Sequence, residues 1–176
     1  MNRDNIEIIQ INISGEDKPG LTSSLTGILA CHDAFILDIG QSNIHQSLTL
    51  GILFMTTPER SGQIMKELLF KASDFGVNIR FYPVPVEEYD DWVSRQGKDR
   101  YILTLLGRKL SAKHITAVTH ILADQELNVD AIKRLTGRQP LDESKAGVRA
   151  CIEFSLRGTP RAREELQREL MKLSSE

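Results

Sequence analysis

Hydrophobic and polar residues in the first half of the chain follow two periods, one typical of strands and the other of helices. Isoleucines alternate with polar residues over 9–14, which predicts a half-buried strand. Apolar residues three and four apart over 21–29 predict an amphipathic helix. The rest of this half gives, in order, strands at 35–39 and 48–54, a helix over 64–75 and a strand over 77–86. This is the order of the ferredoxin-like unit, and Pro83 and Pro85 predict an edge position for its last strand.

The same order begins again in the second half, which predicts an internal duplication. Alternation of apolar and polar residues returns at 101–105 and is clearest at 148–156, which predicts two strands. Ser111 is expected to be the N-cap of the helix that follows the first of them. The halves align at one constant offset of 93 residues, which places Leu29-Ala30 on Leu122-Ala123, Ile36 on Val129 and Ile39 on Ile132.

These patterns predict an α+β protein made of two ferredoxin-like (βαββαβ) repeats. The first is expected to occupy 1–88 and the second 100–176, with the polar stretch 89–99 as a linker. The second repeat lacks its last strand, because only three residues follow Leu173, and the apolar edge at 101–105 should therefore be unpaired. Two explanations stay open: the chain is a fragment of a longer protein, or strands are exchanged within a homodimer.

Charge and composition narrow the class of protein. A net charge of −2 and a pI near 6.1 argue against a nucleic-acid-binding protein. The N-terminus lacks the apolar run of a signal peptide, and no segment reaches the roughly 18 apolar residues of a membrane span. The four histidines and two cysteines have no metal-ligand spacing. We therefore expect a cytoplasmic protein that has no nucleic-acid or membrane partner and no metal site.

The loop after the first strand carries a recognisable motif. The run Asp17-Lys18-Pro19-Gly20-Leu21, followed by an amphipathic helix, resembles the opening of an ACT domain, a ferredoxin-like regulatory unit that binds amino acids. Longer strings resemble the N-terminal half of bacterial phosphoserine phosphatases, in which two ACT-like units precede a hydrolase domain of the haloacid-dehalogenase type. These strings are Asp38–Gln41, Ile44-His45, Leu48–Ile52, Leu106–Arg108, Asn128–Asp130 and Arg134–Gly137.

The chain departs from that family in one chemical respect. The hydrolase domain needs an Asp-x-Asp pair and Mg²⁺, and no Asp-x-Asp occurs in this sequence. The resemblance therefore implies a regulatory part without catalytic residues or a cofactor of its own, the Mg²⁺ belonging to the absent catalytic domain. It also implies L-serine as the ligand, held between repeats or subunits of a homodimer. The alternative is a stand-alone tandem ACT protein that regulates transcription or another enzyme by contact.

The ligand is expected in the loop between the first strand and the first helix. The helix start offers unpaired N–H groups to a carboxylate, and Gly15 and Gly20 allow a ligand to approach the backbone. Asp17 could accept a hydrogen bond from an ammonium group or hydroxyl, and Lys18 lies in the same motif. In the alternative interpretation Asp17 caps the helix, Pro19 occupies its first turn and the glycines only shape the bend.

The second repeat gives a weaker prediction of a site. Its equivalent loop, 106–110, has Gly107 but lacks the acidic residue and the Pro-Gly pair. Asp38, Gln41 and Asp130 lie on predicted second strands, where they either complete a pocket at a domain interface or lie on the ordinary surface. Trp92, in the predicted linker, either docks a missing domain or covers the core of one repeat.

Overall fold

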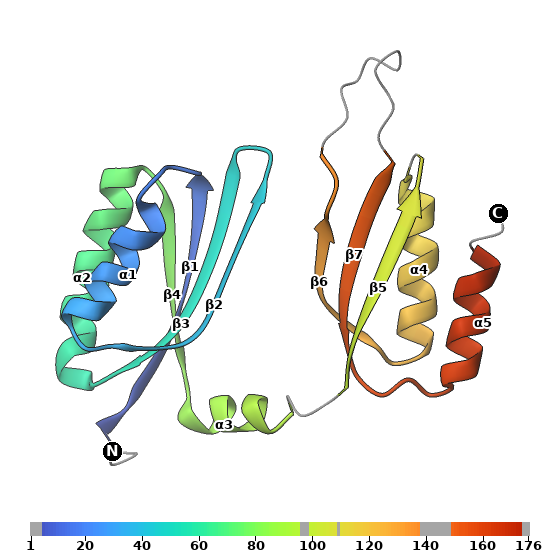
Figure 1. The fold of residues 1–176 in the computed structure, drawn as a ribbon. Coiled ribbons are helices and arrows are strands. Elements are labelled where there is room, and N and C mark those ends of the chain that lie inside the picture. The colour runs from blue at the N-terminus through green and yellow to red at the C-terminus, as the bar shows by residue number, and fades with distance from the viewer. Residues whose placement is uncertain (1–4, 96–98, 109, 138–148, 174–176) are drawn as a thin grey trace. The chain divides into compact units, whose positions relative to one another are not determined.

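The computed structural model describes residues 5–95, 99–108, 110–137 and 149–173. The chain divides into two compact units, Met1–Ser94 and Arg95–Glu176, and each unit is treated by itself (Figure 1). None of the helices in the described ranges is long and apolar enough to cross a membrane.

The first unit has the predicted ferredoxin-like order. Its elements are β1 (Glu7–Glu16), α1 (Leu21–Cys31), β2 (Phe35–Ile44), β3 (Ser47–Thr56), α2 (Pro58–Phe75) and β4 (Asn78–Val84). The strands form one antiparallel sheet in the order β2-β3-β1-β4, and both helices cover the same face of it (Figure 1). The prediction that the proline-containing strand lies at a sheet edge is confirmed, because β4 has a partner on one side only.

The core of the first unit lies between the sheet and the two helices. The isoleucines that alternate along β1 face the helices, and Ile11 and Ile13 have no exposed surface. Leucines at helical spacing, Leu21, Leu25 and Leu29, bring α1 onto this face, as the apolar stripe predicts. The polar residues between the isoleucines, such as Gln10 and Asn12, face the other side of the sheet and are exposed.

The second unit repeats this order without a fourth strand among its described residues. Its elements are β5 (Arg100–Gly107), α4 (Ala112–Asp124), β6 (Asn128–Arg134), β7 (Ala150–Arg157) and α5 (Arg163–Leu173). The sheet order is β5-β7-β6, so β5 has a partner on one side only, as the sequence predicts. Its smaller core includes Val118 and Leu122 of α4, Phe154 of β7 and Leu166 of α5.

Local backbone features show the duplication at the predicted offset of 93. After α1, Asp33 has a positive φ of 52° and Ala34 N–H donates to the carbonyl of Leu29. After α4, Glu126 has a φ of 56° and Leu127 N–H donates to the carbonyl of Leu122. Both following strands also have a bulge at matching positions, between Ile36 and Asp38 in β2 and between Val129 and Ala131 in β6.

The segment expected to be a linker is largely helical. Helix α3 (Val86–Ser94) belongs to the first unit and covers most of the stretch that polar composition predicts to be a loop. Its first turn carries Glu87 and Glu88, whose negative charges are favourable at a helix N-terminus. None of its residues is buried, so the polarity marks an exposed helix rather than a loop.

Candidate functional site

The loop between β1 and α1 ends in a helix start that is shaped by glycine. Gly20 is the N-cap of α1 with a φ of 89°, a conformation that side chains strongly disfavour. The helix begins at Leu21 and has no side-chain cap. Two parts of the alternative interpretation, Asp17 as the cap and Pro19 in the first turn, are therefore wrong, because both residues precede the helix and Gly20 occupies the capping position. Its third part, that the glycines only shape the bend, stays a prediction.

Two charged residues of the loop anchor it to neighbouring elements. The Asp17 carboxylate accepts a hydrogen bond from Asn43 Nδ2, and the Asp17 amide donates to the carbonyl of Gln46 at 3.2 Å. Lys18 Nζ donates to the carbonyl of Phe75 at 2.7 Å. Phe75 is the last residue of α2, so the ammonium group satisfies a carbonyl that has no partner within the helix.

The surroundings of the two glycines of the loop differ. A Cβ on Gly15 would lie 2.8 Å from Val77 Cγ1 and 3.1 Å from Val77 Cα, so the residue must be small for β1 to pass the segment after α2. A Cβ on Gly20 would meet nothing within 4 Å. The space beside Gly20 is therefore open, and a ligand can approach the backbone there but not at Gly15.

Side chains of β2 complete the surroundings of the helix start. Thr22 Oγ1, in the first turn of α1, donates to Gln41 Oε1 at 2.8 Å. Gln41 and Asn43 lie on the helix-covered side of β2, opposite the buried residues Leu50 and Leu48 of β3. The structure thus brings the predicted residues Asp17, Gly20 and Gln41 together with Thr22 and Asn43. Sequence reasoning missed the last two, although Asn43 follows Gln41 by two residues and so shares its face.

Asp38 lies on the other face of the same strand. It is paired with Leu53 in the sheet, three positions from Gln41, and its carboxylate accepts a hydrogen bond from the Ile39 amide at 2.9 Å. It lines a cavity of about 340 Å³ between the helix-free face of the sheet and α3. Asp38 is therefore separated from the helix start that contains Asp17 and Gln41.

The equivalent residues of the second unit do not form one site. A Cβ on Gly107, at the end of β5, would lie 2.8 Å from Leu110 Cδ2. Asp130 lies toward the other end of the sheet and accepts hydrogen bonds from Arg157 Nη2 at 3.0 Å and Asn128 Nδ2 at 2.8 Å. Ser111 is the N-cap of α4, as predicted. A conventional cap thus takes the position that Gly20 holds in the first unit.

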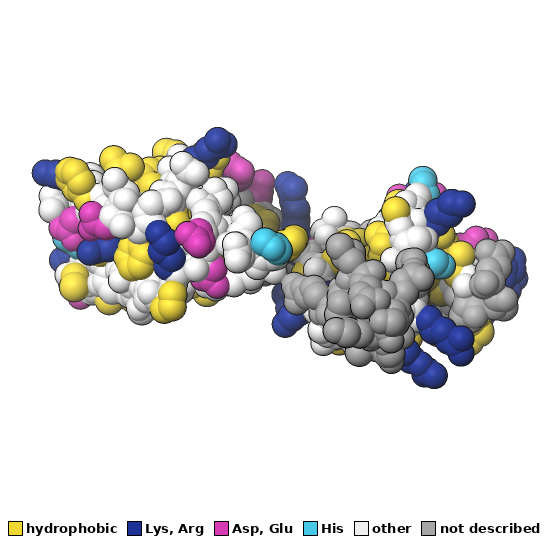
Figure 2. Space-filling view, turned by 90° about the horizontal axis from the view of Figure 1, so that it is seen from above, with side chains coloured by type: hydrophobic (Ala, Val, Ile, Leu, Met, Phe, Trp, Pro, Cys, Tyr) yellow, Lys and Arg dark blue, Asp and Glu magenta, His cyan; other side chains and the backbone are white. Residues whose placement is uncertain are grey.

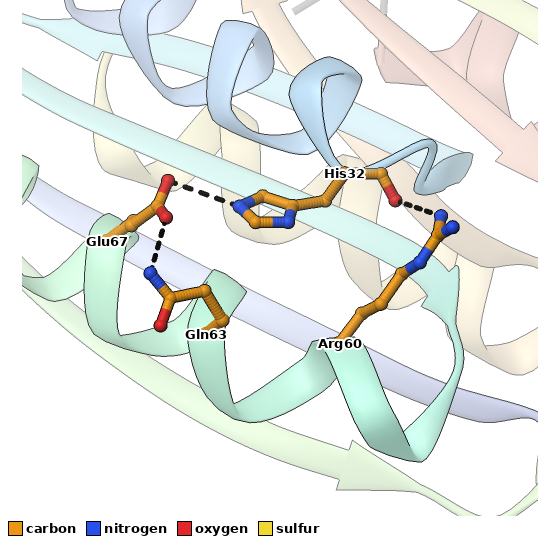
Figure 3. A network of polar contacts seen from close by, with 4 residues as sticks. All are labelled: His32, Arg60, Gln63 and Glu67. Atoms are coloured by element: carbon orange, nitrogen blue, oxygen red, sulfur yellow. Dashed lines mark hydrogen bonds and ion pairs between the residues drawn. The ribbon is translucent and has the colours of Figure 1, made fainter.

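A polar network joins the end of α1 to α2 (Figure 3). His32 Nε2 lies 3.2 Å from Glu67 Oε2, Gln63 Nε2 donates to Glu67 Oε1 at 2.7 Å, and Arg60 Nη1 donates to the carbonyl of His32 at 2.8 Å. The hydrogen bond from Gln63, followed by that from His32, holds the pKa of Glu67 below its ordinary value. Every member of the network has a protein partner, which indicates a structural contact between the helices.

Two further features of the described residues concern a metal site and a basic surface. In the ranges that the structure describes, no three residues of the types His, Cys, Asp and Glu come together as a possible metal site. On the visible face of the first unit, Lys and Arg side chains lie apart among acidic, polar and hydrophobic ones (Figure 2).

Comparison with known families assigns both halves of the chain. Residues 7–82 match one family model described as an ACT domain, and residues 100–176 match a second model with the same description. The two matches together leave only short segments of the chain uncovered. The chain thus carries two ACT domains in tandem, and each half belongs to the ACT domain family.

One curated relative is the phosphoserine phosphatase SerB2 of Mycobacterium tuberculosis strain H37Rv. It is 29% identical over 129 residues, which cover 73% of this chain but only 31% of the relative. The chain therefore spans about a third of that protein's length.

Solved structures confirm the fold over nearly the whole chain. An unknown protein from Galdieria sulphuraria superposes with a TM-score of 0.72 at 14% identity, covering 97% of this chain and 92% of that one. A putative glycine cleavage system transcriptional repressor superposes with a TM-score of 0.64 at 14% identity, covering 97% and 91%. At these identities the likeness shows the fold alone, and it agrees with the predicted tandem α+β ferredoxin-like repeats.

Proposed function

We propose that this chain is an amino-acid-binding regulatory module whose ligand binds at the start of α1. Tandem ACT domains imply a regulatory role based on amino-acid binding. The observation that supports this location is the open helix start at Gly20, which has space for a ligand and polar groups from three sides. The second unit has no comparable arrangement among its described residues.

The chemistry of this helix start suits a small zwitterion. The first-turn amides of Thr22 and Ser23 have no intrahelical acceptor and carry the positive end of the helix dipole, so they favour a carboxylate. The Asp17 carboxylate can accept from an ammonium group, exchanging its bond with Asn43 for one with the ligand. Asn43 and Gln41 are then available for a hydroxyl group, which favours serine over alanine or glycine.

We further propose that the module belongs to a phosphoserine phosphatase and that L-serine is its ligand. The similarity to SerB2 supports this parent, and serine is what the hydrolysis of phosphoserine releases. Catalysis and its Mg²⁺ would then reside in a part of the enzyme outside this chain. A ligand that contacts both the loop and β2 favours one arrangement of units or subunits, and the difference in affinity between arrangements transmits the signal.

A second candidate is a tandem ACT protein that acts by contact with a partner, including a transcriptional one. The likeness in fold to a putative glycine cleavage system transcriptional repressor over nearly all of both chains favours this candidate. The sequence of the full gene distinguishes the two, because a downstream Asp-x-Asp hydrolase domain is required by the first and absent from the second.

Calorimetric titration of the chain with L-serine, glycine, L-threonine and D-serine tests the ligand and its location. We expect saturable binding of L-serine, weakened by about tenfold or more in Asp17→Asn and Asn43→Ala, because each removes a polar contact in the site. Glu59→Gln is the matched control. It removes an exposed carboxylate from the first turn of α2, whereas the loop contacts α2 at its last residue. Equal affinity in the control and both site variants, or no binding by any amino acid of the series, would contradict the proposal.

A further inference from the structure

The cavity that Asp38 lines is on the helix-free face of the first sheet, away from the start of α1. It measures about 340 Å³, within the usual size range of small-molecule sites, and α3 forms its other wall. Gly40 and Gly51 are paired directly across β2 and β3 in its floor. Two side chains are thus missing at adjacent positions of the sheet, which leaves a hollow.

Packing within the unit does not require these two glycines. A Cβ on Gly40 would meet nothing within 4 Å, and one on Gly51 would come no closer than 3.6 Å to another atom. Neither residue has a positive φ. The fold of this unit would therefore accept larger residues at both positions, and the glycines leave a hollow in the sheet. Gly15 differs, because its Cβ would clash with Val77.

The polar lining of the cavity is acidic. Asp38 from β2 and Glu88 from α3 both line it, and no Lys or Arg does. The Asp38 carboxylate accepts only the amide of the next residue, and across the ranges that the structure describes neither carboxylate pairs with a basic side chain. Two carboxylates that share a cavity with no Lys or Arg in its described lining favour a cationic occupant.

Two aromatic rings complete the lining. Tyr89 and Trp92 of α3 lie with ring centroids 5.8 Å apart and planes tilted by 42°, and both border the cavity. Tryptophan is the aromatic side chain that attracts a cation most strongly through its ring face. Leu53 and Val84 add apolar surface, which suits a short alkyl chain.

We propose that this cavity binds a small organic cation of the alkylammonium class, such as a diamine. The aromatic rings and carboxylates attract the ammonium group, and the apolar wall contacts the chain. An α-amino acid is disfavoured, because its carboxylate would lie near Asp38 and Glu88. The site is distinct from the amino-acid site proposed above and does not depend on it, since Asp38 and Gln41 lie on opposite faces of β2.

The chain offers a direct reporter for this site. Trp92 is the single tryptophan, so a titration followed by its fluorescence reads the cavity wall alone. We would titrate the whole chain with 1,4-diaminobutane, and use butylammonium, L-serine and succinate at equal ionic strength as comparisons. We expect a saturable change with 1,4-diaminobutane, a weaker one with butylammonium and none with succinate.

Variants on the two walls sharpen this test. Asp38→Asn and Glu88→Gln should each weaken binding by about threefold, the effect of losing one charge contact with an exposed carboxylate. Glu87→Gln is the matched control, because it removes the same charge from the neighbouring position of α3 without lining the cavity. Gly40→Val should block binding by filling the hollow without any change of charge.

Several outcomes would overturn the proposal. These are the absence of a saturable change with 1,4-diaminobutane, an equal change produced by sodium chloride, and equal weakening by Glu87→Gln and Glu88→Gln. Undiminished binding in Gly40→Val would also exclude the cavity as the site. Binding of L-serine without any response of Trp92 would leave the amino-acid site intact, so the two proposals can fail separately.

Discussion

The first strand of each repeat has the same place in the chain path but a different environment. In the first unit, β1 lies between β3 and β4, and its core residues Ile11 and Ile13 are fully buried. In the second unit, β5 has only β7 beside it among the described strands. Leu103 and Leu105, which pair with β7 as Ile11 and Ile13 pair with β3, are only partly buried. The other face of β5 is more open still, with Ile102 62% exposed.

Comparison of the two units shows which features a repeat keeps when its described residues include no fourth strand. The turn with positive φ after the first helix and the bulge in the second strand are present in both units, because residues close in sequence determine them. Burial of the first strand is not retained, because it depends on a distant segment. A cavity of about 610 Å³ lies between β5 and the two helices of this unit, and its lining includes Leu103 of β5, Val118 of α4 and Leu170 of α5.

The largest expected effect is a contrast between the two strand cores. Ile11→Ala should cost about 3–4 kcal/mol of unfolding free energy, because it leaves a cavity in a fully enclosed site. Leu103→Ala should cost about 1–2 kcal/mol, because part of that side chain already contacts water. Hydrogen exchange in increasing denaturant, followed on peptides from each unit separately, measures both values.

Ile11→Val and Leu103→Val serve as controls that keep the apolar character and remove less volume. A cost for Leu103→Ala as large as that for Ile11→Ala would break the comparison. It would show that another strand covers the edge of β5 in solution, from a second copy or from a further segment of the protein.

The next effect concerns the two glycines at the ends of β1 and β5. Gly15→Ala should destabilise the first unit by about 1–3 kcal/mol, because the added Cβ meets the backbone of Val77, which cannot move without shifting β4. Gly107→Ala should cost less than about 1 kcal/mol, because its Cβ meets only the end of the flexible Leu110 side chain. Thermal unfolding of the two variants measures the difference, and equal costs would contradict this assignment of the two contacts.

The element order and the duplication were predictable from sequence because both depend on local periodicity. The isoleucines of β1, the leucines of α1 and the Ser111 cap of α4 each express the pattern that predicts them. The edge position of β4 followed from Pro83, which cannot donate a hydrogen bond in a sheet interior. These features need no knowledge of distant contacts.

The grouping of the site residues was less predictable, because it depends on which face of β2 each side chain occupies. Asp38 and Gln41 were grouped together by their strand, yet an odd spacing places them on opposite faces. Asn43, which contacts Asp17, follows Gln41 by an even spacing and was missed. Helix α3 was missed because an exposed helix with no buried residue has the composition of a loop.

The smallest expected effect is a difference in pH dependence at the end of the first helix of each repeat. His32 contacts the Glu67 carboxylate, whereas Gln125, at the matching position, accepts from the backbone amide of Ala162 at 2.9 Å. Of these two contacts, only the one in the first unit includes a carboxylate, which loses its charge when it is protonated. Hydrogen bonds from Gln63 and then from His32 hold the pKa of Glu67 below its ordinary value of 4.5 in the folded protein, so together they stabilise the first unit above that pH. The contribution is lost as the pH falls through the lowered folded-state value.

Hydrogen exchange measures the unfolding of each unit between about pH 6 and pH 3.5. The first unit should lose a little stability as the pH falls through this range, and Glu67→Gln should remove that loss. His32→Gln should reduce the same loss, since it gives the first unit the residue that the second unit has. Asp74→Asn is the matched control, because it removes an exposed carboxylate of α2 outside this network. If the pH dependence of the first unit is unchanged in Glu67→Gln, the contact between the helices is held by Arg60 and the backbone carbonyl of His32 rather than by the titrating pair.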